Sequence, residues 1–454
     1  MAKKSVDMTS GPLLSKIVLF IIPLLITDII QRLYTLADML VVGRFAGSSA
    51  LAAVGSTSHF ISLITGILGN IAIGVSAVTA QALGAKDNDC VNRTVHTAMA
   101  ISLLGSIIFA LTGIIFCKRI LYLMDTPESI IDKAALYMRI ILAGYPVSAI
   151  YNFGAAIIRA KGDSKSPLVF LTISGIINVI LNMIFVIVFG MGVEGVALAT
   201  ILSQIVSALF VIKSLESDNY PYKIQTREIK IHFKEFKRIM FIGVPIAMQG
   251  MLSSFSNMVL QSAVNSFGEI TVAGAAAALD VISILYIIVV APSRAATIFT
   301  GQNIGAEKYD RVLKVLLYSI SIVLILGIPS CCLVFIFGKQ LIGLFVKEHI
   351  VIEQGLKILN ILAPIYFICG IPETLSCCLK GMNKSVHSMI SSVTGQIGIR
   401  VLWILTFFPA HRSLKTLYLV YPISWTFVII ADAIIFLVCF KKLKRKEISM
   451  VSVT

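Results

Sequence analysis

Hydrophobic residues run almost without interruption along this chain and are broken at intervals by short polar segments. An apolar run of more than about 18 residues is long enough to cross the hydrocarbon core of a bilayer as a helix. Twelve such runs can be distinguished, at residues 13–42, 50–80, 94–116, 134–158, 166–190, 194–212, 239–265, 270–301, 312–337, 356–379, 386–408 and 416–440. The pattern therefore predicts an all-α integral membrane protein with twelve transmembrane helices.

The first predicted span carries a polar face. Asp28, Gln31, Tyr34, Thr35 and Asp38 fall on one side of a helix that turns by about 100° per residue. Ionisable groups inside a membrane segment are costly, and they mark ion or substrate paths. The alternative is that both acids lie near the ends of the span, among the lipid headgroups.

The twelve spans form two halves that repeat each other. Four features recur in the same order at offsets of 218 to 222 residues: Pro23 and Pro245, the segments Gln81–Lys86 and Gln302–Lys308, Pro146 and Pro364, and Gly162 and Gly381. Because each half has an even number of spans, both halves enter the membrane from the same side. Parallel repeats of this kind pack around a central cavity. Such a pair of lobes favours a transporter over a receptor or a membrane enzyme.

The polar segment between the halves predicts a linker that includes a short amphipathic helix on the membrane surface. In the segments Gln81–Lys86 and Gln302–Lys308, we expect the glycines to form tight turns. The expected organisation is a cytoplasmic N-terminus at 1–12, an N-terminal six-helix lobe at 13–212, a linker at 213–238, a C-terminal six-helix lobe at 239–440 and a cytoplasmic tail at 441–454.

The net charge of +15 reflects topology. Of the 38 Lys and Arg residues, 25 lie in the segments on one side of the predicted spans and nine on the other. Excess positive charge marks the cytoplasmic side and attracts anionic lipid, so both termini are expected inside a cell membrane. No nucleic-acid-binding motif accompanies the charge, so nucleic acid is not expected as a partner.

The residues that carry catalysis in other proteins show no characteristic spacing here. The eight cysteines include no C-x-x-C pair, and the six histidines include no H-E-x-x-H pattern. There is also no P-loop and no G-x-S-x-G motif. We therefore expect no enzyme activity, no cofactor and no structural metal. We also expect a monomer.

Three sequence patterns resemble the multidrug and toxic compound extrusion (MATE) family. They are Tyr34-x-x-x-Asp38-x-x-x-x-Gly43-Arg44-x-x-Gly47, Ala-Leu-Ala-Ala-Val54-Gly55 and Gly301-Gln302-Asn303-x-Gly305-Ala306. The resemblance covers the whole chain and is greatest to the DinF-like branch. It implies a V-shaped pair of six-helix lobes. It also implies export of amphipathic, often cationic organic compounds in exchange for H⁺ or Na⁺.

The resemblance places the coupling ion in the N-terminal lobe. Carried over by motif, the group comprises Asp38, Tyr34, Asn152, Asn178 and Thr200. One position departs from the family pattern, because Asn182 stands where the fifth span usually has an aspartate. Asparagine can donate and accept hydrogen bonds but cannot titrate. Asp38 would then carry most of the coupling, assisted at most by Asp28.

Further residues could belong to the coupling or substrate path. They are Asp28, Gln31, Thr35, Gln204, Met248, Gln249, Met251, Phe255, Asn257, Asp280, Glu373 and Asp432. Methionines and aromatic residues suit a pliable drug cavity, but they are also common in ordinary packing. The C-terminal acids could instead form ion pairs with Arg294 or Arg400. In the NorM-like branch the cation is carried by acids on spans seven and ten, and residues 246–264 contain no acid.

The residues leave the identity of the ion open. A carboxyl group in a low-dielectric lobe is disfavoured in its charged form and could exchange a proton. A carboxylate surrounded by asparagine, threonine and backbone oxygens could equally hold a hard cation. Binding at Asp38 would rearrange the hydrogen bonds of the first span, where Pro23 is a weak point.

A lipid-linked saccharide flippase with the same lobe architecture is the alternative function. Its anionic cargo would require several basic residues in the cavity. Only four lie within the predicted spans, namely Arg32, Arg139, Arg294 and Arg400.

Overall fold

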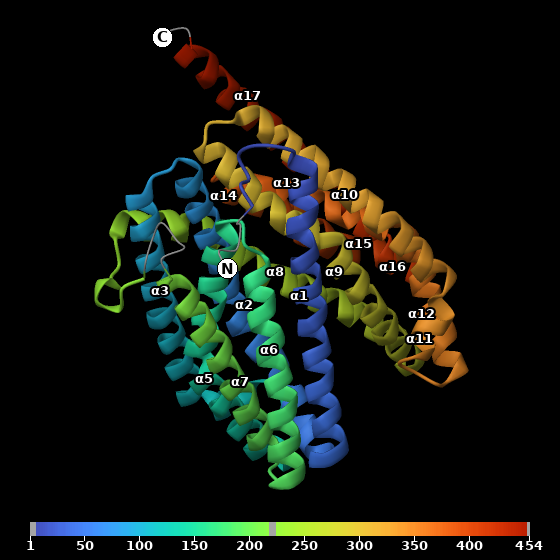
Figure 1. Ribbon diagram of the computed structural model, residues 1–454. Coiled ribbons are helices and arrows are strands. Elements are labelled where there is room, and N and C mark those ends of the chain that lie inside the picture. Colours follow the sequence, from blue (N-terminus) through green and yellow to red (C-terminus); the bar gives the residue numbers. More distant parts are fainter. Residues whose placement is uncertain (1–5, 218–223, 452–454) are drawn as a thin grey trace. The chain divides into compact units, whose positions relative to one another are not determined.

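The computed structural model describes residues 6–217 and 224–451, and within these ranges the chain forms helices and no strand (Figure 1). Twelve helices in this part of the chain are long and apolar enough to cross a membrane. The prediction of an all-α membrane protein with twelve transmembrane helices is confirmed. Several helices extend a few residues beyond the predicted spans; the first runs over Leu13–Ala46 and the second over Ser48–Gly84.

The first compact unit contains residues 26–247 together with Val6. Its helices are the second half of α1 (Leu13–Val41), the π-helix η1 (Val42–Ala46), α2 (Ser48–Gly84), α3 (Asn88–Ile115), α4 (Cys117–Leu123), α5 (Glu128–Ala160), α6 (Lys165–Asn182), the π-helix η2 (Met183–Val188), α7 (Val193–Glu216), the 3₁₀ turn η3 (Thr226–Glu228) and the first half of α8 (Phe233–Asn265). The helix α5 packs against α2, α3 and α7, and α6 packs against α7.

The second compact unit contains residues 7–25 and 248–451. Its helices are the first half of α1, the second half of α8, α9 (Glu269–Gly305), α10 (Tyr309–Ile336), α11 (Gly338–Gly343), α12 (His349–Leu362), the 3₁₀ helix η4 (Ala363–Cys369), α13 (Gly370–Gly381), α14 (Ser385–Ser392), the π-helix η5 (Val393–Ile399), α15 (Arg400–Ala410), α16 (Leu414–Tyr418) and α17 (Val420–Val451). The helix α9 packs against α10, α12 and α13, and α13 packs against α17.

Two of the unit boundaries fall inside a helix, each two residues after a proline. In α1 the boundary follows Leu25, and Pro23 lies within the helix. In α8 it follows Ala247, and Pro245 lies within the helix. The predicted lobes at 13–212 and 239–440 remain a prediction, and the compact units differ from them by these two half helices.

Close helix contacts hold each half helix in its unit. In the first unit, a Cβ atom at Gly74 of α2 would lie 2.8 Å from the carbonyl oxygen of Ile239 and 2.9 Å from the nitrogen of Gly243, both on α8. Small residues permit this close approach of two backbones. In the second unit, Phe20 of α1 packs edge-on against Phe299 of α9, with ring centroids 5.7 Å apart.

The chain before α1 is held by side chains from the second unit. Lys308 donates a 2.8 Å hydrogen bond to the carbonyl of Thr9, and Arg311 donates to the carbonyls of Ser10 and Gly11. The side-chain amide of Asn303 donates to the carbonyl of Met8, which is fully buried. Because Asn303 and Lys308 belong to the second copy of the repeated polar segment, that copy binds the start of the chain.

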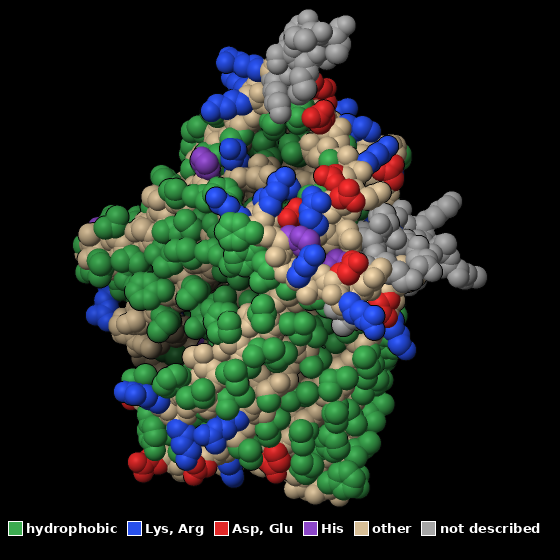
Figure 2. Space-filling view, turned by 90° about the vertical axis from the view of Figure 1, so that its left-hand side faces the viewer, with side chains coloured by type: hydrophobic (Ala, Val, Ile, Leu, Met, Phe, Trp, Pro, Cys, Tyr) green, Lys and Arg blue, Asp and Glu red, His purple; other side chains and the backbone are tan. Residues whose placement is uncertain are grey.

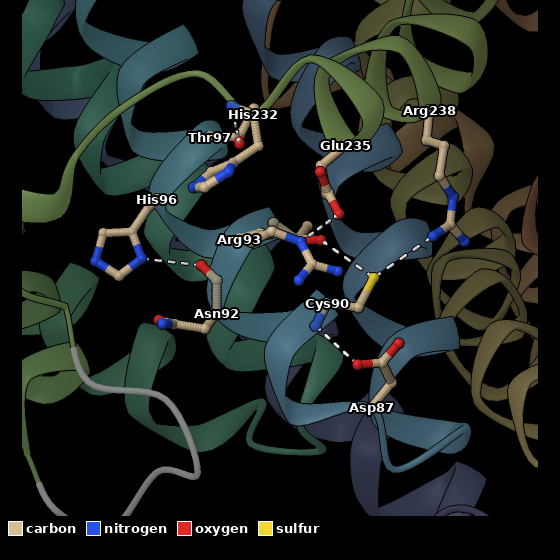
Figure 3. A network of polar contacts seen from close by, with 10 residues as sticks. Asp87, Cys90, Asn92, Arg93, His96, Thr97, His232, Glu235 and Arg238 are labelled. Atoms are coloured by element: carbon tan, nitrogen blue, oxygen red, sulfur yellow. Dashed lines mark hydrogen bonds and ion pairs between the residues drawn. The ribbon is translucent and has the colours of Figure 1, made fainter.

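The linker before α8 is held in the same way by α3 of the first unit (Figure 3). Arg93 and Glu235 form an ion pair at 2.8 Å, and the Glu235 side chain is almost completely buried. The backbone N–H of His232 donates to the Thr97 hydroxyl at 3.1 Å.

Two further contacts bind the linker region. The backbone N–H of Gln225 donates to His96, and the Arg238 guanidinium donates to Gln81. The sequence predicts a short amphipathic helix within 213–238. Residues 224–232 contain one 3₁₀ turn and no such helix, and residues 218–223 lie outside the part of the chain that the structure describes. The backbone N–H groups of Gln225 and His232 bond to side chains of α3, whereas Glu235 and Arg238 already belong to α8.

The sequence predicts that glycines form the tight turns after α2 and α9, but other residues form them. Gly84 and Gly305 end their helices, and the residues with left-handed backbone are Lys86 and Glu307, at φ values of 56° and 55°. The expectation of glycine turns is thus wrong, although both repeats turn in the same way.

Hydrophobic side chains cover much of the face shown in Figure 2, and charged side chains gather in bands above and below them. Exposed leucine, isoleucine and phenylalanine residues are numerous along the long helices. A lipid environment accounts for such a surface, since hydrocarbon is then the solvent for these side chains.

Candidate functional site

The first unit brings the acid of the first span against the end of the fifth. The side-chain amide of Asn182, on α6, donates a hydrogen bond of 2.5 Å to Oδ1 of Asp38, on α1. Asn182 is fully buried and Asp38 is half-buried. Asn182 therefore contacts the acid from the position where the family pattern has a second acid.

This hydrogen bond continues into a chain of polar side chains. Asn182 also donates to the side-chain carbonyl of Asn178 at 3.3 Å, and Asn178 donates to the hydroxyl of Thr200, on α7, at 3.5 Å. The side-chain oxygen of Asn182 is buried and has no hydrogen-bond partner within the described residues. Buried polar atoms without partners are rare, so this oxygen is available to a further ligand.

Tyr34 fixes α1 against α6 one turn before the acid. Its hydroxyl donates to the carbonyls of Leu171 and Thr172 at 3.1 and 3.0 Å. The ring lies over Gly175, where an added Cβ atom would be only 1.5 Å from the ring carbon Cζ. Glycine is thus required for Tyr34 to occupy this position, which sequence reasoning missed because no motif includes Gly175.

Both partners of the short hydrogen bond lie just before a π-helix. The segment η1 begins four residues after Asp38, and η2 begins directly after Asn182. The two π-helices pack against each other. Short π-helical segments widen a helix locally and occur frequently at functional sites.

Two residues of α5 lie differently from the sequence prediction. Asn152 is half-buried, and within the described residues no hydrogen bond joins it to the chain of polar groups around Asp38. Tyr137 was not predicted, yet the Asp38 carboxylate acts on it electrostatically. A single tyrosine in an apolar span carries no sequence signal, so only packing could reveal it.

The remaining residues of the predicted polar face lie in various environments. Gln31 and Thr35 are exposed, and the Thr35 hydroxyl donates to the carbonyl of Gln31. Asp28 is half-buried, as is Gln204 on α7. Their role in the path remains a prediction.

The predicted path residues of the second unit also divide by exposure. Met248, Met251, Phe255 and Asn257 are exposed on α8. Gln249 is buried, and its side-chain oxygen has no partner within the described residues. On α9 and α13, Asp280 and Glu373 are half-buried.

The chemistry available at Asp38 is that of ion binding. One carboxylate, two amide side chains and a hydroxyl offer oxygen atoms from three helices, and no nucleophile is activated by a neighbouring base. Among the described residues no cluster of three His, Cys, Asp or Glu side chains could hold a metal ion. The site lacks the ligands of a transition metal and suits a proton or a hard monovalent cation.

Twelve membrane-spanning helices in repeated halves, with a buried polar group inside one unit, define a multi-pass membrane transporter. The MatE family model matches residues 23–184 and 245–405, which cover most of both repeats. The chain belongs to the MatE family, and the resemblance found in the sequence is confirmed at this level. The protein is therefore a membrane transporter of the multidrug efflux family and not an enzyme; its assignment to the DinF-like branch remains a prediction.

Named relatives agree with this assignment. The chain is 29% identical over 390 residues to the probable multidrug resistance protein YoeA of Bacillus subtilis, covering 84% of each. It is 28% identical over 406 residues to the probable multidrug resistance protein YpnP of the same organism, covering 89% of each. A crystal structure of MATE in the bent conformation matches with a TM-score of 0.88 at 23% identity, over 98% of this chain and 99% of that one. At that identity, the structural likeness shows the fold alone.

Proposed function

We propose that the protein is a secondary active antiporter that exports amphipathic, cationic organic compounds in exchange for H⁺ or Na⁺. The observation that carries this proposal is the chain from Asp38 through Asn182 and Asn178 to Thr200, with an unpartnered oxygen on Asn182. The relatives named as multidrug resistance proteins support the class of substrate.

Asn182 can form a hydrogen bond with Asp38 in both protonation states of the acid. When Asp38 is ionised, the amide donates to it, as in the structure. When Asp38 is protonated, its hydroxyl can donate to the amide oxygen after a flip of the Asn182 side chain, because an amide offers a donor and an acceptor. A sodium ion would use the same oxygens, together with those of Asn178 and Thr200. A bound proton thus reverses the direction of the hydrogen bond between α1 and α6, whereas a bound sodium ion replaces it.

The two helices that connect the units provide a route from the ion to the rest of the protein. Asp38 lies on the part of α1 that belongs to the first unit, while the part before Pro23 belongs to the second. A proline removes one hydrogen bond from its helix and marks a position where the helix can bend. Ion binding at Asp38 thereby acts on the helix that joins both units, as alternating access requires.

The orientation with both termini in the cytoplasm, contact with anionic lipid and a monomeric state belong to the same proposal. The excess of Lys and Arg on one side of the spans supports the orientation. The lipid flippase has less support. Arg400, a basic residue within a span, is buried and occupied, since its guanidinium lies 4.4 Å from the ring centroid of Tyr421 and donates to Ser424.

Transport in everted membrane vesicles tests the proposal. A fluorescent cationic dye should accumulate when either a proton gradient or a sodium gradient is imposed, and the gradient that works identifies the ion. Asp38→Asn should reduce gradient-driven accumulation by about fivefold or more, as expected when a coupling free energy of about 1–3 kcal/mol is lost. Asp132→Asn, which changes an exposed acid of the same unit, is the matched control.

Two results would contradict the proposal. If neither gradient moves any cationic dye, antiport is refuted and the flippase becomes the better hypothesis. If Asp38→Asn transports as well as the unchanged protein at equal expression, Asp38 is not the coupling residue.

A further inference from the structure

The second unit contains a buried acid that the proposed coupling mechanism does not use. Asp432 lies in α17, and its side chain has no solvent exposure. Its Oδ1 accepts a hydrogen bond from the hydroxyl of Ser391, on α14. Its Oδ2 is also buried, and no described residue donates to it. One oxygen of this carboxyl group is therefore held in place, and the other is open to a ligand.

The Ser391 hydroxyl that bonds to Asp432 belongs to a group of serine hydroxyls. The hydroxyls of Ser376 and Ser388 bond to each other, and Ser391 also donates to the carbonyl of Ser388 at 2.9 Å. These serines come from α13 and α14, both of which pack against α17. The second unit thus places a group of small polar side chains between three helices.

Two charged groups act on Asp432 electrostatically, Lys380 and Glu373, and both lie on α13. Lys380 is 5% exposed, and among the ion pairs within the described residues none joins it to Asp432. The helix α14 also carries His387, whose side chain is exposed. Asp432 is therefore influenced by a nearby ammonium group but not neutralised by a direct contact with it.

The corresponding helices of the first repeat meet through apolar side chains. The sequence repeat has an offset of 218 to 222 residues, and Ser391 and Asp432 follow Phe170 and Phe210 by 221 and 222. In the first unit those two phenylalanines stack between α6 and α7, with ring centroids 5.6 Å apart. An apolar pair therefore joins the equivalent helices of one repeat, whereas the other repeat has a buried acid with an unpartnered oxygen. An ionisable group kept inside a membrane protein without a packing need indicates a function.

We propose that Asp432 is a second proton-exchanging carboxyl group, located in the second unit and distinct from Asp38. A proton from water forms an O–H bond at Oδ2 and converts the carboxylate to the neutral acid, while Ser391 keeps its hydrogen bond to Oδ1. Release breaks that bond and returns the proton to water. A proton fits better than a sodium ion, because a single open oxygen is too small a ligand set for a metal cation and Lys380 repels one.

Infrared difference spectroscopy of the purified protein in lipid tests this assignment. On titration with acid, a protonated carboxyl band from a buried site should appear, be lost in Asp432→Asn and be displaced in Asp432→Glu. Asp38→Asn should leave this band in place, which separates the inference from the proposed function. The matched control is Asp310→Asn, an exposed acid of the same unit whose change should leave the band unaltered.

Dye export as a function of pH provides the second measurement. Asp432→Asn should lose part of the pH dependence that the unchanged protein shows, and Asp432→Glu should restore it. The inference is overturned if the band persists in Asp432→Asn, or if the Asp432 signal responds to sodium and not to pH. It is also overturned if the glutamate variant, which retains an acid even should the asparagine variant fail to fold, shows no displaced band.

Discussion

Asn182 and Asp38, 144 residues apart in the sequence, meet through a hydrogen bond of 2.5 Å between side chains of α6 and α1. The family pattern places a second aspartate where this chain has the asparagine. The amide at the substituted position still contacts Asp38 directly. In the proposed mechanism, one carboxylate and one amide therefore take the place of two carboxylates.

Restoring the second acid should change how the site binds its ion. In Asn182→Asp, two carboxyl groups at hydrogen-bond distance cannot both be ionised, so the pair is expected to share one proton. We expect dye export to depend more steeply on pH than in the unchanged protein, measured in vesicles over a series of pH values. Asn88→Asp, which adds an acid at an exposed position of the same unit, should export as before. Identical pH and sodium dependence in Asn182→Asp and the unchanged protein would exclude Asn182 from the coupling site.

The position of Tyr34 should depend on the absence of a side chain at residue 175. Gly175→Ala would place a carbon atom 1.5 Å from the tyrosine ring, so the ring must move, at a cost of about 1–3 kcal/mol. Tyr34→Phe loses only the hydrogen bonds of the hydroxyl, which contribute about 0.5–1.5 kcal/mol. Thermal unfolding should show the larger decrease for Gly175→Ala. The control is Gly69→Ala, where an added Cβ meets no atom within 4 Å.

The effects of the two residues should also be non-additive. In a double variant with Tyr34→Ala, the alanine at residue 175 no longer displaces a ring, and part of the stability should return. Fully additive losses would mean that Tyr34 does not lie over Gly175 in the membrane.

The contact of α2 with α8 should tolerate no side chain at Gly74. A Cβ atom there would lie within 3 Å of backbone atoms of Ile239 and Gly243, which cannot rotate away as a side chain can. We expect Gly74→Ala to lower the free energy of unfolding by about 1–3 kcal/mol. Gly66→Ala on the same helix, with no atom within 4 Å of the added carbon, should be neutral or slightly stabilising. Equal melting temperatures for the two variants would argue against this close crossing.

The ion pair between Arg93 and Glu235 should contribute to stability, because its acid is 2% exposed. Glu235→Gln weakens a charged hydrogen bond and should cost about 1–2 kcal/mol. The pair of Lys118 and Asp132 has a similar distance of 2.7 Å, but both side chains are at least half exposed. Asp132→Asn should therefore leave the melting temperature unchanged. If both substitutions had the same effect, burial would not be what distinguishes the two pairs.

Acid should loosen the linker around His232. Burial, followed by the neighbouring Lys230, lowers the pKa of this histidine below its usual value. The folded protein therefore binds a proton at His232 less readily than the unfolded chain, and linker docking is fully favoured only above the usual value of 6.5. As the pH falls below that value, the stabilisation is lost.

Limited proteolysis of residues 224–232 measures this opening. Cleavage relative to a site elsewhere in the chain should increase between about pH 7.5 and pH 5.5. The increase should disappear in His232→Gln and persist in His96→Gln. Persistence in His232→Gln would assign the pH dependence to another group.

The sequence predicted more of the fold than of the candidate site. Twelve spans, two repeats and the importance of Asp38 followed from hydrophobic length, constant offsets and one acid inside a membrane segment. Local patterns are sufficient for these features, because a bilayer restricts a spanning segment to a helix of fixed length. The hydrogen bond of Asp38 with Asn182 brings together two residues that the family resemblance grouped, and their coupling role stays a prediction. Among the described residues, no hydrogen bond joins Asn152 to this group.

Contacts between distant segments had no sequence signal. The place of Tyr34 over Gly175, the electrostatic effect of Asp38 on Tyr137 and the 3₁₀ turn within residues 224–232 each depend on which residues meet across helices. The sequence shows that the polar segments Gln81–Lys86 and Gln302–Lys308 repeat each other, but it does not show which parts of the chain they contact. Gln81 and Asn303 bind, respectively, the start of α8 and the chain before α1.

The sequence by itself determined a twelve-span, duplicated membrane transporter with an acid in its first span, because hydrophobic length and repetition can be read one segment at a time. Only the tertiary structure decided that α1 and α8 each belong to two units, with boundaries two residues after Pro23 and Pro245. It also decided that Asp38 has an amide as its partner and that Asp432 retains an unpartnered oxygen. These features depend on side-chain packing across helices, and periodicity along one helix carries no information about which residue faces it from another.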